Sequence, residues 1–80
     1  MEKKVFFSKF SCYEMVHCYQ KRKGWKVHVI KPDDVFYEVY YEKEGYPMMF
    51  GFGMPITSDG IEYAFQIAWA NIDNYRDLFN

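Results

Sequence analysis

Three stretches in the middle of the chain alternate between apolar and other side chains. They cover residues 25–30, 35–43 and 46–54. A period of two is typical of β-strands that bury one face. Pro32 and Gly45 stand between these stretches, where the composition is that of turns. The pattern therefore predicts three consecutive antiparallel strands joined by short turns.

The register between the strands decides which face each one buries. A two-residue turn at Glu44-Gly45 would place Val39 opposite Phe50, with the apolar rows of both strands on one face. The register of the first hairpin stays open. A three-residue loop would put the apolar residues of the first strand on the core face, and a two-residue loop would turn them away. These residues are Trp25, Val27 and Val29.

Helices are predicted on both sides of the three strands. Ser11 followed by Glu14 fits a capping box, and Gly24 suits the position just after a helix end. Residues 12–22 are therefore predicted to be helical. Asp59 is the best N-cap for a second helix, which continues with apolar residues at helical spacing towards the end of the chain.

The fold class that follows is α+β, with the element order (β)αβββα. Residues 3–7 form either a short edge strand or an irregular lead-in. We expect a three-stranded antiparallel sheet with both helices packed on one face, since this arrangement buries the apolar sides of both. A chain of 80 residues is the size of one domain, so residues 1–80 are predicted to be a single unit.

Charge is divided unequally between the two parts of the chain. Residues 1–31 contain eight basic and two acidic residues, a net charge of +6, whereas residues 32–80 contain two basic and nine acidic residues, a net charge of −7. Such asymmetry hints at a charged partner. Local roles explain much of it, because cations suit a helix end and acids suit helix starts. If the two helices lie side by side, the opposite charges would largely cancel.

The two cysteines and two histidines are the residues that could form a disulfide or a zinc site. In a helix, Cys12 and Cys18 would be about 9 Å apart along the axis, beyond the roughly 7 Å between Cα atoms that a disulfide allows. Reduced thiols and a cytoplasmic location are therefore expected. Together with His17 and His28 they match no zinc spacing, so no metal and no cofactor are expected.

No combination of residues predicts an enzyme. Gly51-Phe52-Gly53 lies in a predicted strand and lacks the third glycine of a dinucleotide-binding loop. Glu38 and Glu42 lie on one face of a predicted strand, but a chain this short has little room for a substrate cleft. No apolar run approaches the roughly 20 residues of a membrane span, so no membrane contact is expected.

A nucleic-acid-binding module is one hypothesis for the function. Its phosphate contacts would come from basic residues near the end of the first helix, namely Lys21, Arg22, Lys23 and Lys26. The element order αβββα resembles that of the double-stranded-RNA-binding domain. That family places a lysine-rich run at the start of its last helix, where this chain has the acidic stretch 58–62. The resemblance is therefore one of topology only.

The favoured hypothesis is a small, non-enzymatic domain that binds a protein partner or a second copy of itself. An apolar centre within a charged rim is typical of such surfaces. The residue usage would suit a bacterial or phage accessory protein or inhibitor that occludes its partner. The candidate contact residues are Phe36, Glu38, Tyr40, Glu42, Met49 and Trp69.

Overall fold

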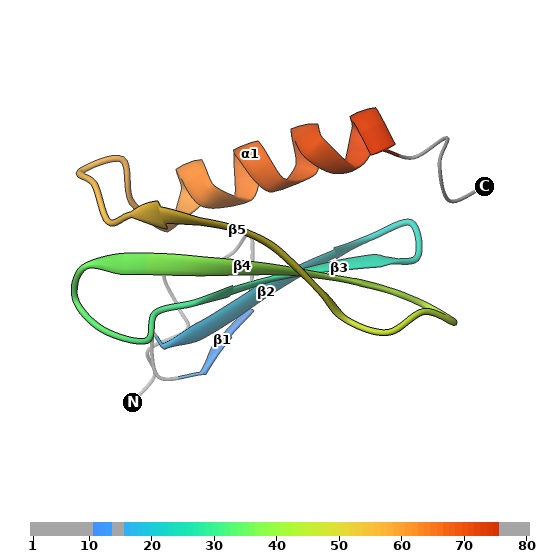
Figure 1. The fold of residues 1–80 in the computed structure, drawn as a ribbon, viewed down its shortest axis with the longest axis horizontal. Helices are drawn as coiled ribbons and strands as arrows, with labels where there is room; N and C mark the ends of the chain where they lie inside the picture. Colours follow the sequence, from blue (N-terminus) through green and yellow to red (C-terminus); the bar gives the residue numbers. More distant parts are fainter. Residues whose placement is uncertain (1–10, 14–15, 76–80) are drawn as a thin grey trace.

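The computed structural model describes residues 11–13 and 16–75, which form five strands and one helix (Figure 1). The sheet has the order β1-β2-β3-β4-β5, and every neighbouring pair of strands is antiparallel. The helix lies across one face of this sheet. The elements are β1 (Ser11–Tyr13), β2 (His17–Arg22), β3 (Trp25–Ile30), β4 (Phe36–Lys43), β5 (Met49–Pro55) and α1 (Gly60–Tyr75).

The predicted three-stranded sheet with two helices is therefore wrong. In the range predicted to be helical, residues 12–13 belong to β1 and residues 17–22 form β2, which pairs with β3 along its whole length. The cause is the turn at Lys23-Gly24, whose φ angles are 49° and 85°. Two consecutive residues with positive φ are typical of a tight β-hairpin turn. Gly24 thus has the backbone conformation expected of it, but as part of a hairpin. Residues 3–7 lie outside the described part of the chain.

The core lies between α1 and the face of the sheet that it covers. The open question about the first hairpin is settled by burial, since Trp25, Val27 and Val29 are all buried on this inner face. The helix contributes buried residues at helical spacing, and β4 contributes every second side chain. The core residues are Cys18, Trp25, Val27, Val29, Tyr37, Val39, Tyr41, Met54, Ala64, Phe65, Ala68, Trp69 and Ile72.

The register between β4 and β5 differs from the predicted one. Val39 lies opposite Phe52 in place of Phe50, and the register shifts between Val39 and Tyr40. A Cβ atom on Gly51 would be only 2.8 Å from the ring of Tyr41, so the glycine lets this ring lie against the strand backbone. A glycine at a β-bulge commonly has this role. The bulge therefore reverses the orientation of Met49 and Phe50, so that Met49 lies on the inner face and Phe50 on the outer face.

Local hydrogen bonds stabilise the turn between β4 and β5 and the segment that leads into α1. Tyr46 N–H donates to the carbonyl of Lys43 over 2.9 Å, which closes a turn at Gly45 (φ 87°). Before α1, the backbone N–H of Asp59 donates to Oγ1 of Thr57 over 3.3 Å.

No helix in the described residues is long and apolar enough to cross a membrane.

Candidate functional site

The face of the sheet opposite α1 brings together four of the six predicted contact residues. Tyr37, Val39 and Tyr41 of β4 are buried under the helix. Because side chains alternate along a strand, the residues between them point to the opposite, outer face. With one residue of β5, these form what we call the aromatic–acidic face: Phe36, Glu38, Tyr40, Glu42 and Phe50.

The aromatic residues of this face are strongly exposed for their size. Phe36 is 48% exposed and Phe50 is 58% exposed. Phe50 lies opposite Tyr40, and the two rings meet edge to face with their centroids 5.4 Å apart. Edge-to-face contact is a favourable arrangement for two aromatic rings. The pair therefore forms a fixed aromatic surface on the two strands.

Two of the predicted contact residues lie elsewhere. Met49 pairs with Tyr41 and packs against the core, and Phe50 takes the place on the outer face that was expected for Met49. The bulge causes this exchange, and the glycine inside a strand was the sequence signal for it. Trp69 is buried at 7% exposure on the inner face. Its indole N–H donates to Oε1 of Gln20.

Glu38 is the acidic group at the centre of the face. Its Oε1 accepts a hydrogen bond from the hydroxyl of Tyr40 over 3.2 Å. Desolvation, and then the neighbouring Glu38, raise the pKa of Tyr40 above its ordinary value. Among the described residues, no cation lies within ion-pair distance of Glu38. The carboxylate is thus oriented by Tyr40, and no cation of the described residues neutralises it.

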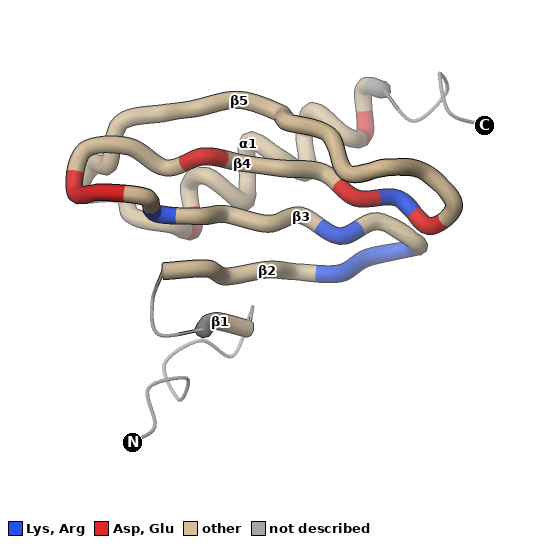
Figure 2. The backbone as a smooth tube through the Cα atoms, turned by 60° about the horizontal axis from the view of Figure 1, so that its bottom comes forward, with Lys and Arg blue, Asp and Glu red and all other residues tan. Residues whose placement is uncertain are grey.

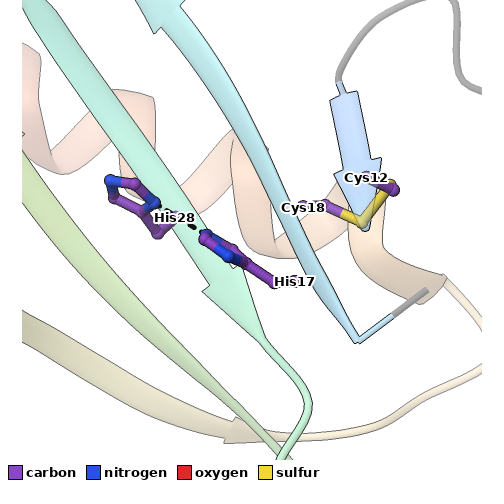
Figure 3. Close-up of a disulfide and its surroundings, with 4 residues drawn as sticks. All are labelled: Cys12, His17, Cys18 and His28. Atoms are coloured by element: carbon purple, nitrogen blue, oxygen red, sulfur yellow. Dashed lines mark hydrogen bonds between the residues drawn. A yellow bond between two sulfur atoms is a disulfide. The ribbon is translucent and has the colours of Figure 1, made fainter. Parts of the chain in front are cut away.

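Glu42 ends a chain of hydrogen bonds that the sequence did not reveal. Its Oε1 lies 2.9 Å from Nε2 of His28, and Nδ1 of His28 lies 2.8 Å from Nε2 of His17 (Figure 3 draws the two histidines). The hydrogen bond from His28 is the main reason that the pKa of Glu42 is lowered. Burial, and then His28 and Lys26, lower the pKa of His17. Burial and these two neighbours therefore favour the neutral imidazole at His17.

The cysteines form a disulfide, which corrects the prediction of reduced thiols. Cys12 and Cys18 lie directly opposite each other on β1 and β2, with their Cα atoms 3.9 Å apart (Figure 3). The spacing argument failed because it assumed a helix. Among the described residues, no group of three or more His, Cys, Asp or Glu could hold a metal ion.

The four basic residues of the nucleic-acid hypothesis lie at and next to the β2–β3 turn, where Figure 2 shows basic positions in blue. Their side chains do not all lie on one face of the sheet. Lys21 pairs with Lys26 on the outer face. Arg22 lies on the inner face, with its guanidinium 4.7 Å from the ring centre of Trp69. Lys26 is also opposite Glu42, so acidic and basic groups of the two charge halves meet here. The order βββββα also ends the topological likeness to the double-stranded-RNA-binding domain.

A groove lies between α1 and β2. Its volume is about 420 Å³, and a neighbouring hollow of about 340 Å³ shares three of its residues, including Arg22 and Trp69. The lining mixes aromatic rings with acidic, basic and amide groups, and offers no pair of a nucleophile and a base. The lining residues are Gln20, Arg22, Glu62, Phe65, Gln66, Trp69, Ala70 and Asp73.

Comparison with known proteins gives no relative from which a role could be transferred. The chain matches no protein-family model, no curated protein and no solved structure.

Proposed function

We propose that this protein is a non-enzymatic binding domain that attaches to a protein partner through the aromatic–acidic face. The observation that supports it best is the exposure of Phe36 and Phe50, at 48% and 58%, on one face beside two carboxylates. Large exposed apolar side chains with a polar rim are typical of protein-binding surfaces. A domain of this kind would act as an accessory protein or inhibitor by covering its partner's surface.

The charge of the face favours a partner with basic groups. Glu38 lies between Phe36 and Tyr40 on the outer side of β4, and Glu42 lies further along the strand, opposite Lys26. Asp33 and Glu44 lie in the loops at the two ends of β4. Backbone hydrogen bonds from Val35 and Phe36 lower the pKa of Asp33, so it carries its charge at neutral pH. Complementary charge raises the rate and the specificity of association.

The cellular location belongs to the same proposal. A cytoplasmic location was expected because the thiols were expected to be reduced. The Cys12–Cys18 bridge supports an oxidising compartment, because disulfides persist there and are rare in the cytosol.

The test is affinity purification from the native host with the full chain as bait. Phe36→Ala combined with Phe50→Ala should lose the captured partner, because both rings are removed from the contact while the core is unchanged. Tyr63→Ala is the matched control, since Tyr63 is an exposed aromatic residue on α1, at 42% exposure. Capture of the same partner by the double variant, or no partner with any bait, would contradict the proposal.

A further inference from the structure

We propose that β5 is a docking edge, which binds an extended segment of the partner as a sixth strand carrying a lysine or arginine opposite Gly53. This inference rests on the proposed function and specifies the binding mode and the chemistry of the partner segment. Strand addition to a sheet edge gains affinity from backbone hydrogen bonds and specificity from alternate side chains.

The backbone of β5 directs hydrogen-bonding groups away from β4 at this edge. Within the described residues, β5 pairs only with β4. The N–H of Ile56 donates to the carbonyl of Val35 over 2.9 Å. Because bonded and non-bonded pairs alternate in an antiparallel ladder, the pair Tyr37–Met54 is bonded as well, and the N–H and C=O of Gly53 point away from β4. Gly53 is exposed.

The edge lacks the charges that usually prevent strands from pairing. Residues 45–58 contain no charged residue, and they include the whole of β5. Natural sheets often protect an edge with lysine, proline or a bulge. Here the bulge lies near Gly51, and Pro55 removes one N–H, so the stretch between them remains able to pair.

Gly53 leaves a gap in the row of side chains on the outer face. A Cβ atom there would meet nothing closer than the carbonyl oxygen of Tyr37 at 3.6 Å, so packing within the chain does not require glycine. Across the gap lies Glu38. On either side stand the pairs Phe36–Pro55 and Tyr40–Phe50. The gap thus has an acidic end and apolar walls.

A basic side chain from an added strand fits this gap. Neighbouring strands are about 4.8 Å apart, so a residue paired with Gly53 would have its Cα roughly 10 Å from that of Glu38. An extended lysine or arginine can bridge this distance to a carboxylate. Glu38 has no cation within ion-pair distance among the described residues. Residues two positions before and after the basic one would pack on the apolar walls.

A second copy of the chain fits less well than a partner of this chemistry. Antiparallel pairing of β5 with its own copy would meet no repulsion along the edge, but β5 carries no basic residue to place in the gap. Each Glu38 would then remain unneutralised. The partner segment is therefore expected to have apolar residues at alternate positions around a central lysine or arginine.

The experiment is selection from a displayed library of random peptides with the full, disulfide-bonded chain as bait. Enriched peptides should share a basic residue with apolar neighbours at two positions to either side. Affinity for a synthetic peptide of the enriched sequence is then measured for the wild type, Gly53→Val and Glu38→Gln. The valine fills the gap and should weaken binding at least tenfold, and the loss of the carboxylate should weaken it several-fold.

Controls separate this inference from the proposed function. Valine favours strand structure, so Gly53→Val should unfold at the same temperature as the wild type or higher, which excludes misfolding as the cause. Peptides that lose affinity with Phe36→Ala but not with Gly53→Val would overturn strand addition and leave the binding face in place. No enrichment, enriched peptides without a basic residue, or a concentration-dependent dimer that Gly53→Val abolishes would each overturn the inference.

Discussion

The two edges of the sheet differ in length, charge and covalent restraint. β1 has only three residues and is joined to β2 by the Cys12–Cys18 disulfide. β2 carries basic side chains at its end, and its inner face contacts α1 through Gln20 and Arg22. β5 has seven residues, no charge and two glycines, and no described strand lies beyond it.

The β1 edge is thus stabilised by a covalent bond, whereas the β5 edge is left exposed among the described residues. A covalent bridge is a strong restraint for a strand too short to be stable alone. The β5 edge has no such restraint and no charge, and only the bulge near Gly51 and Pro55 limit its pairing with another strand. The contrast between the edges therefore supports a binding role for β5, and the following changes test it from the largest expected effect to the smallest.

Replacing Trp69 should cause the largest loss of stability. Trp→Ala in a core typically costs about 3–5 kcal/mol, and Trp69 is buried where α1 meets β2. Phe50→Ala on the β5 side should cost about 1 kcal/mol or less, because Phe50 is 58% exposed and mainly loses its edge contact with Tyr40. Denaturant unfolding measures both. Similar losses for the two variants would contradict the assignment of Trp69 to the core and Phe50 to the surface.

Reduction of the disulfide should have the next largest effect. The bridge closes a loop of residues 12–18, for which chain entropy gives a stabilisation of about 2 kcal/mol. Unfolding by denaturant with and without a reductant measures the difference. Before reduction, mass spectrometry should find no thiol that reacts with an alkylating reagent. Two reactive thiols in protein that was never exposed to reductant would refute the bridge.

The two glycines of β5 should respond oppositely to alanine. Gly51→Ala places a methyl group against the ring of Tyr41, and such overpacking costs about 1–3 kcal/mol. Gly53→Ala meets no close atom and should be neutral or stabilise the fold by about 0.5 kcal/mol, since glycine is unfavourable within strands. Thermal unfolding of both variants checks this. A loss of stability for Gly53→Ala would mean that the gap is already filled.

The pH dependence is the smallest expected effect. The pKa of His17 is lowered in the folded state, with Lys26 and His28 facing it. Its contribution is therefore full above its ordinary pKa of 6.5, and it is lost as the pH falls from that value through the lowered pKa of the folded state. The pKa of Glu42 is also lowered, so its contribution is present above 4.5 and is lost at lower pH. Both make the fold less stable in acid.

The matched variant for this pH dependence is His17→Gln, which cannot be protonated. Between pH 7 and pH 5, the melting temperature of this variant should fall less than that of the wild type. Below pH 4.5, the two melting temperatures should fall by similar amounts. An unchanged profile would contradict the role given to His17.

Strands with strong alternation and the amphipathic helix could be predicted from the sequence, and β3, β4 and α1 lie close to their expected positions. β2 could not be predicted, because only Cys18 among its residues is fully buried, and its alternation is hidden by polar side chains. A capping pattern at Ser11 and Glu14 then favoured a helix. Gly24 directly before the predicted strand at residue 25 indicates a hairpin turn, and therefore a strand before it, better than it indicates a helix end.

The candidate face was predictable as far as β4, where period two places Phe36, Glu38 and Tyr40 together. The β5 side could not be predicted, because the bulge shifts the register by one residue. This shift places Phe50 on the outer face and Met49 on the inner face. The histidine chain to Glu42 depends on pairing between strands that the sequence did not specify.

The most direct test of the difference between the edges is amide hydrogen exchange at Gly53, measured by NMR on the isolated monomer. In an open edge, the N–H of Gly53 has no strand partner and should exchange at nearly the rate of an unfolded chain. The amide of Met54, which faces β4, should be protected by orders of magnitude. Protection of Gly53 equal to that of Met54 would show that the edge is already covered and would contradict the docking edge.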